Sequence, residues 1–125
     1  MRDPIRVVVA DDHPLYREGV ITSLASDPGL VVVGQAADAA GAVRVVSEHL
    51  PDVVLLDVTM PGGGLEAAAR IATACPATRI IMLTVSDDED DRQAAMRAGA
   101  SAYVLKGVSA TELTRVVRSV HAGEI

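Results

Sequence analysis

The chain has 125 residues, of which 50% are hydrophobic and 22% charged, and this composition is typical of one globular domain. Its formal net charge of −6 and 2% aromatic content argue against direct binding of nucleic acid or of an anionic membrane. The single cysteine, Cys75, excludes an internal disulfide and is typical of a reducing cytoplasmic compartment. No apolar run approaches the roughly 20 residues of a membrane span.

Five short β-branched or apolar segments are predicted to form strands, at residues 5–10, 30–34, 53–56, 79–84 and 102–105. The runs at 7–9 and 53–56 are continuously apolar, as expected for central strands of a parallel sheet that is covered on both faces.

Segments with helical periodicity follow the strands. Apolar residues recur at spacings of three and four over 16–24, 43–50 and 113–120. Asp38 is a candidate N-cap, and Ser109 with Glu112 has the spacing of a capping box. Strands that alternate with helices predict a doubly wound α/β domain with right-handed crossovers, and the chain is too short for an eight-fold barrel.

Polar residues follow four of the predicted strands. Asp11 and Asp12 follow the first strand and Asp57 the third, while the fourth ends at Thr84 and the fifth just before Lys106. The carboxyl ends of parallel strands share one edge of the sheet, where doubly wound folds bind their ligands. We therefore expect these five side chains to lie in one cleft.

Three carboxylates in one cleft repel one another unless a cation joins them. A hard divalent ion with oxygen ligands, Mg²⁺ or Mn²⁺, meets this need. Asp57 is ionised near neutral pH and can attack phosphorus without a general base. Lys106 suits a site in which a phosphoryl group comes to lie between it and Asp57.

Each of these residues alone has an ordinary structural explanation. Asp11 and Asp12 could cap the first helix ahead of Pro14, and Asp57 could cap a turn. His13 could be a metal ligand, although a place in the turn before the first helix explains it more simply. The joint pattern, rather than any single residue, is specific for phosphoryl chemistry.

The segments 8–14, 54–61, 81–84 and 98–106 together resemble the receiver domain of response regulators, over essentially the whole chain. The runs Ala-Asp-Asp-His-Pro-Leu at 10–15 and Arg-Ala-Gly-Ala at 97–100 are most similar to the NarL/FixJ (LuxR-type) subfamily. The resemblance implies a flavodoxin-like (βα)5 fold with strand order 2-1-3-4-5. It also implies one receiver domain over 1–125, with a helix-turn-helix effector domain expected to lie outside this chain.

The resemblance implies a role for each residue of the predicted cleft. Asp57 matches the phosphoacceptor. Asp12 matches a direct metal ligand and Asp11 one that acts through water. Thr59 matches the residue whose backbone carbonyl completes the metal site.

Three further positions match residues that bind the phosphoryl group or change conformation in response to it. Lys106 matches the lysine that pairs with a phosphoryl oxygen. Thr84 matches the switch hydroxyl, and Tyr103 the aromatic residue that moves between outward and inward rotamers.

The chain departs from the family pattern in three places. The loop after the third strand, residues 60–65, reaches its leucine one residue early, and its three glycines are expected to adopt unusual backbone angles. Gly107 follows Lys106 where many receivers have a proline preceded by a cis bond, so the isomer here is not predicted. Val85 is bulkier than the usual neighbour of the switch residue, and we expect it to narrow access to Asp57.

The resemblance implies a switch that accepts a phosphoryl group from a sensor histidine kinase and controls transcription through the C-terminal DNA-binding domain of the full-length protein, with a homodimer as one assembly to test. A Mg²⁺-dependent phosphohydrolase with an aspartate nucleophile is a second hypothesis. Such an enzyme often has a second acid two residues after its nucleophile, and here that position is Thr59. A flavin-binding module on the same doubly wound fold and a stand-alone receiver without DNA-binding output are two further hypotheses.

Overall fold

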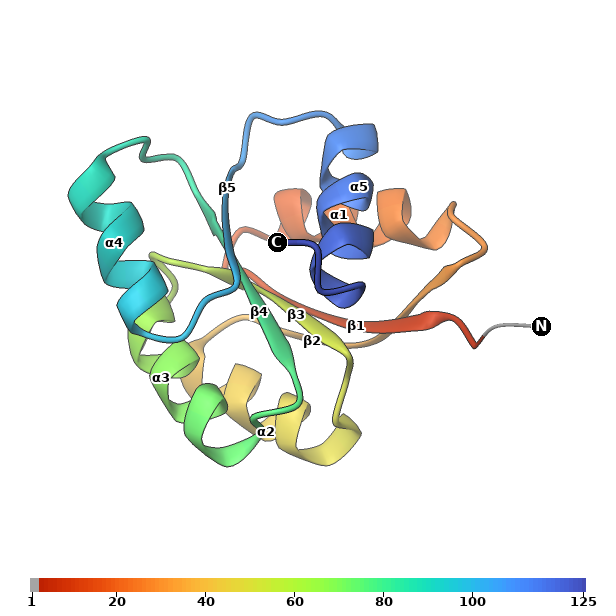
Figure 1. The fold of residues 1–125 in the computed structure, drawn as a ribbon. Helices are drawn as coiled ribbons and strands as arrows, with labels where there is room; N and C mark the ends of the chain where they lie inside the picture. Colours follow the sequence, from red (N-terminus) through yellow and green to blue (C-terminus); the bar gives the residue numbers. More distant parts are fainter. Residues whose placement is uncertain (1–2) are drawn as a thin grey trace.

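A computed structural model describes residues 3–125 and shows five strands that alternate with five helices (Figure 1). The elements in chain order are β1 (Ile5–Ala10), α1 (Pro14–Ala25), β2 (Leu30–Ala36), α2 (Ala39–His49), β3 (Val53–Asp57), α3 (Gly64–Ala74), β4 (Arg79–Thr84), α4 (Glu89–Arg97), β5 (Ala102–Leu105) and α5 (Ala110–His121). All five predicted strands are confirmed.

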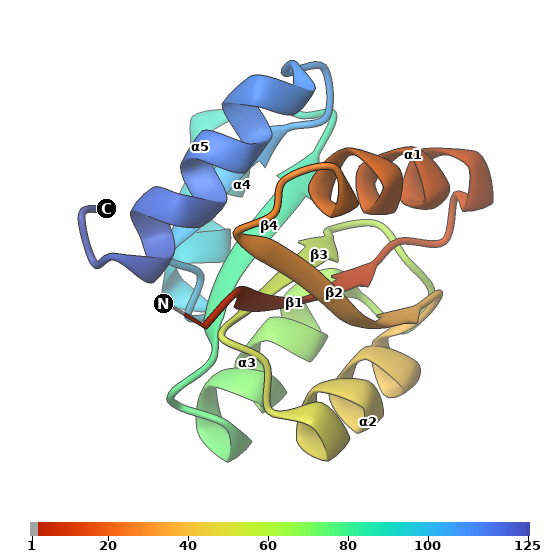
Figure 2. The ribbon, with the colours of Figure 1, turned by 90° about the vertical axis from the view of Figure 1, so that its right-hand side faces the viewer.

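The strands form one parallel sheet in the order β2-β1-β3-β4-β5, which confirms the doubly wound, flavodoxin-like fold. Helices α1 and α5 cover one face of the sheet, and α2, α3 and α4 cover the other (Figures 1 and 2). From β1 the sheet grows toward β2 on one side, and from β3 it grows toward β4 and β5 on the other, so the order of the strands switches between β1 and β3. The carboxyl ends of these two central strands border the crevice where ligands bind in such folds.

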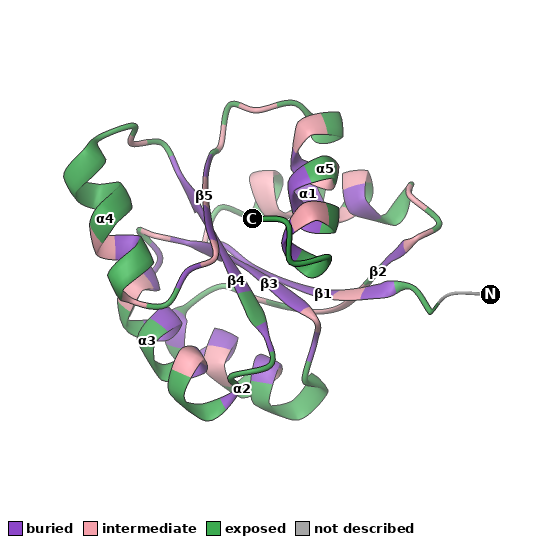
Figure 3. Cartoon of the chain, in the orientation of Figure 1, coloured by how far each residue is buried: buried purple, intermediate pink, exposed green. Residues whose placement is uncertain are grey.

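Alternate residues of each central strand enter two separate cores. Val7 and Val9 of β1 pack with α1 and α5, whereas Val8 and Ala10 pack with α2 and α3. Every residue of β3 is buried, and the central strands are the buried layer in Figure 3. Burial on both faces explains the continuous apolar runs in the sequence and fixes the strand ends firmly.

Strand β2 extends two residues beyond its predicted end at Gly34. The register between β1 and β2 shifts after Val7, so that Val8 pairs with Gly34 and Ala10 with Ala36. At Gly34 a Cβ atom would lie only 2.6 Å from Val45 of α2, so glycine allows a close approach of helix and strand. The glycine that marked the end of the predicted strand is therefore a packing site within it.

The predicted helix caps form. Asp38 accepts a hydrogen bond from the amide of Gly41 at 2.6 Å, and Ser109 accepts one from the amide of Glu112 at 3.1 Å. The carboxylate of Glu112 pairs with Arg115 in the next turn of α5 rather than with the amide of Ser109, so only half of the predicted capping box forms. The acidic residues at 88–91 cap α4 and lie in its first turn, where they interact favourably with the helix dipole. Within residues 3–125, no helix is long and apolar enough to cross a membrane.

Candidate functional site

The carboxyl edge of the sheet brings the predicted side chains together. Asp11 follows β1 and Asp57 is the last residue of β3, so both carboxylates start from buried strand ends. Thr84 ends β4, and the amide of Lys106, just after β5, donates a hydrogen bond to the carbonyl of Thr84 at 2.7 Å. Oxygen atoms of Asp11, Asp12 and Asp57 lie within 4.8 Å of one another.

The carboxylates of this site are withdrawn from water. The side chain of Asp11 is 0% exposed and that of Asp57 is 1% exposed, while Asp12 is half-buried. Among the described residues, the buried Oδ2 atom of Asp57 has no hydrogen-bond partner. A buried carboxylate oxygen without a partner is costly unless a cation binds it. The acidic cluster is therefore typical of a receiver metal site, and a divalent cation fits the residues present.

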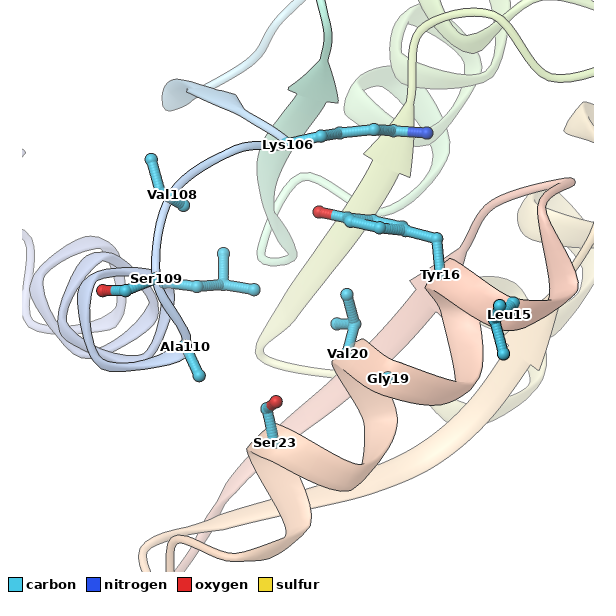
Figure 4. Close-up of a pocket in the computed structure, with 10 residues that line it drawn as sticks. Leu15, Tyr16, Gly19, Val20, Ser23, Lys106, Val108, Ser109 and Ala110 are labelled. Carbon is cyan, nitrogen blue, oxygen red and sulfur yellow. The ribbon is translucent and has the colours of Figure 1, made fainter.

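Lys106 supplies a positive charge on the opposite wall. Its Nζ atom lies 2.7 Å from Asp11 Oδ2 and 3.4 Å from Asp57 Oδ1, so it contacts Asp11 more closely than Asp57. The ammonium group also lies 4.7 Å from the centre of the Tyr16 ring. Figure 4 shows the lysine side chain crossing above this ring, over a groove of about 300 Å³ between α1 and the start of α5.

The contacts of Asp57 favour its ionised form. Burial raises the pKa of this carboxyl group, but hydrogen bonds from Thr59 and the positive charge of Lys106 outweigh burial and hold the pKa below its ordinary value. The amide and hydroxyl of Thr59 donate to Asp57 Oδ1 at 3.1 and 3.2 Å. These bonds hold the ionised Asp57 carboxylate in one orientation and leave its Oδ2 atom without a hydrogen-bond partner.

Thr84 and Tyr103 are both bonded to Ser86. The Thr84 hydroxyl accepts a hydrogen bond from the amide of Ser86 at 3.0 Å, and the Tyr103 hydroxyl donates to the carbonyl of Ser86 at 2.9 Å. The Ser86 hydroxyl in turn donates to Asp91 of α4 at 2.6 Å. The hydrogen bonds of Ser86 therefore join the end of β4 and Tyr103 of β5 to α4.

The glycine-rich loop at residues 60–65 lies beside the backbone of Asp57. Gly62 and Gly63 have φ angles of 86° and 88°, as expected for glycines in unusual conformations. Gly64 instead begins α3, and a Cβ atom there would collide with the carbonyl oxygen of Asp57 and lie 2.7 Å from the Cα atom of Val58. The third glycine is therefore needed for close backbone approach rather than for its φ angle.

The interpretation of Asp11 and Asp12 as caps of α1 is wrong. The N-cap residue is His13, no side chain caps the helix, and Asp11 Oδ1 accepts a hydrogen bond from the amide of His13 at 2.8 Å. This bond bends the chain so that the His13 ring turns back toward the carboxylates. The ring position depends on the turn geometry, which the sequence did not indicate.

Two of the departures from the family pattern lie at the mouth of the site. The bond between Lys106 and Gly107 is trans, as are all peptide bonds in the described range. Val85 is 83% exposed and lines an open apolar hollow together with Leu15 and Gly107. Val85 therefore lines the same hollow as His13 and Lys106, and the expectation that it narrows access to Asp57 stays a prediction.

An acidic pocket with a facing lysine, at the carboxyl edge of a 2-1-3-4-5 sheet, is typical of the phosphoacceptor domains of signalling proteins. The family described as "Response regulator receiver domain" matches residues 7–118, and the chain belongs to this family. Its relatives place it in the NarL/LuxR-type group of two-component signalling proteins. Membership of this family decides against a phosphohydrolase and against a flavin-binding module.

Individual relatives agree with this assignment. The chain is 40% identical over 121 residues to the response regulator GacA of Pseudomonas aeruginosa, and 40% identical over 116 residues to the probable transcriptional regulatory protein NarL of Mycobacterium tuberculosis. These matches cover 96% and 92% of this chain but 56% and 54% of the relatives, so the chain spans about half the length of these curated proteins.

The similarity extends to solved structures. The signal receiver domain of the putative NarL from M. tuberculosis superimposes with a TM-score of 0.94 at 38% identity and covers 98% of this chain and 99% of that one. A LuxR-family two-component response regulator from Aurantimonas sp. SI85-9A1 has a TM-score of 0.92 at 38% identity and covers 97% of this chain and 87% of that one.

Proposed function

We propose that Asp57 of this receiver accepts a phosphoryl group from the phosphohistidine of a sensor histidine kinase, with Mg²⁺ bound by Asp11, Asp12, Asp57 and the backbone carbonyl of Thr59. The observation that carries the proposal is the arrangement around Asp57. One of its buried oxygens is bonded by Thr59, the other has no partner, and an ammonium group lies 3.4 Å away.

The ionised Asp57 forms a bond from a carboxylate oxygen to phosphorus while the bond from phosphorus to the histidine nitrogen breaks. The products are an acyl phosphate and a neutral imidazole, which takes a proton from solvent as the bond from phosphorus to nitrogen breaks. The metal ion would offset negative charge on the carboxylates and on the phosphoryl oxygens. Lys106 then moves from Asp11 toward a phosphoryl oxygen, and its charge stabilises the transferring group.

The same change would reach α4 through Thr84. When the Thr84 hydroxyl donates to a phosphoryl oxygen, it releases the amide of Ser86, to which Tyr103 is also bonded. The loop before α4 and the Tyr103 ring are then free to take a second arrangement. We propose that this change controls a C-terminal DNA-binding domain joined to the receiver and regulates transcription in the cytoplasm, because the relative NarL is named as a probable transcriptional regulatory protein.

Phosphorylation of the isolated chain tests the proposed function. Incubation with a small phosphodonor such as acetyl phosphate and Mg²⁺ is expected to add the mass of one phosphoryl group, measured by intact-mass spectrometry. Asp57→Asn should form no adduct, and omission of Mg²⁺ should largely prevent the reaction of the parent. A parent protein that forms no adduct at millimolar Mg²⁺ would contradict the proposal.

A further inference from the structure

The His13 ring lies within the acidic cluster. Its Nδ1 atom is 2.8 Å from Asp11 Oδ1, 3.1 Å from Asp12 Oδ1 and 3.7 Å from Asp57 Oδ2. One ligand atom from each of Asp11, Asp12, His13 and Asp57 lies within 4.8 Å of the other three. One imidazole nitrogen therefore faces an oxygen of each carboxylate in the site.

These separations match the coordination shell of a small divalent ion. Metal–ligand distances of about 2.1 Å place neighbouring octahedral ligands about 3.0 Å apart and opposite ligands about 4.2 Å apart. The distances from Nδ1 to the oxygens of Asp11 and Asp12 fall near the first value. The third distance, 3.7 Å to Asp57 Oδ2, lies between the two values, and this buried oxygen has no hydrogen-bond partner.

We infer that His13 Nδ1 is a direct ligand of the metal site and shifts its preference from Mg²⁺ toward first-row transition metals such as Mn²⁺, Ni²⁺ and Zn²⁺. Carboxylate oxygens suit Mg²⁺, whereas an imidazole nitrogen suits the transition metals. The inference rests on the proposed function, because Asp11, Asp12 and Asp57 form the rest of the shell. It adds a nitrogen ligand from this chain to a site otherwise built from oxygens.

The hydrogen bonds of His13 Nδ1 are compatible with a role as a metal ligand. Nδ1 makes a hydrogen bond with Asp11 Oδ1, and Lys106 Nζ lies 3.4 Å from it. A neutral imidazole carries its proton on either nitrogen, so transfer of the proton to Nε2 leaves the Nδ1 lone pair for the metal. The ring is 59% exposed, which allows water to carry out this transfer and keeps the fold independent of the side chain.

Calorimetric titration of the apo protein with Ni²⁺ and with Mg²⁺ tests the inference. His13→Ala is expected to weaken Ni²⁺ binding by about tenfold or more, since even loss of an outer-shell partner costs that much, while Mg²⁺ affinity changes by less than about threefold. The matched control is His121→Ala, which removes an exposed histidine at the end of α5 and should leave both affinities unchanged.

The outcomes separate this inference from the proposed function. If His13→Ala leaves the ratio of Ni²⁺ to Mg²⁺ affinity unchanged, or if it tightens both metals because the ring had been blocking the site, the inference is wrong and the proposed function stands. If the parent binds no Mg²⁺, the proposed function fails. An imidazole NMR spectrum with Zn²⁺ should show the His13 Nδ1 resonance moving on binding, and movement of Nε2 alone would overturn the assignment.

Discussion

Gly64→Ala is expected to lower the free energy of unfolding by about 3 kcal/mol or more, within the range that overpacking and backbone displacement produce. The new Cβ atom would meet the carbonyl of Asp57 and lie 2.7 Å from Cα of Val58, and these are backbone atoms of a buried strand end. Neither can move without disturbing the sheet. Chemical denaturation monitored by circular dichroism measures the loss.

Gly107 and Gly19 provide the controls for this prediction, because a Cβ atom at either position has no neighbour within 4 Å. Gly107→Ala should change the free energy of unfolding by less than about 0.5 kcal/mol. Gly19 lies within α1, so Gly19→Ala should stabilise the protein by about 0.5–1 kcal/mol through helix propensity. A Gly64→Ala protein as stable as the Gly107→Ala protein would show that the loop adapts and that the close approach is not required.

Lys106→Met is expected to destabilise the metal-free protein by about 3 kcal/mol, the lower end of the cost of removing one partner from a buried ion pair. The ammonium group is 12% exposed and contacts both Asp11 and Asp57, which are almost fully buried. Its removal leaves these carboxylates to repel each other. Urea denaturation in the presence of a chelator measures the effect, and millimolar Mg²⁺ should restore part of the loss.

A second substitution tests whether the loss of stability in Lys106→Met comes from uncompensated negative charge in the cleft. Adding Asp57→Asn to Lys106→Met removes one of the uncompensated carboxylates, so the double variant should be more stable than the single one. Arg92→Met is the matched control, because Arg92 and Glu89 form an exposed pair at 3.9 Å that contributes little. If Lys106→Met and Arg92→Met have the same stability, the carboxylates of the cleft do not depend on the lysine.

The fold could be predicted from the sequence because its determinants are local and periodic. Continuous apolar runs marked the central strands, and the cap residues Asp38 and Ser109 marked two helix starts. The end of β2 was misplaced because Gly34 has two opposite uses, as a chain terminator and as a site of close packing, and only the neighbouring helix decides between them.

The edge of the sheet could be predicted as the site for a topological reason. The carboxyl ends of parallel strands lie at one edge of the sheet. The residues that directly follow these strands are therefore close together, regardless of the conformation of the loops. The orientation of His13, the bond from Ser86 to Thr84 and the preference of Lys106 for Asp11 could not be predicted. These contacts depend on turn geometry and rotamers, which residue type and spacing do not specify.

The most direct test of the central claim is the position of the phosphoryl group on the chain. After reaction with acetyl phosphate and Mg²⁺, borohydride reduces an aspartyl phosphate to homoserine, and peptide mass spectrometry locates the altered residue. We predict homoserine at position 57 alone, because Asp57 Oδ2 is buried without a hydrogen-bond partner, whereas Asp11 is engaged by His13 through one oxygen and by Lys106 through the other. Homoserine at position 11 or 12, or at an aspartate outside the cleft, would contradict the account.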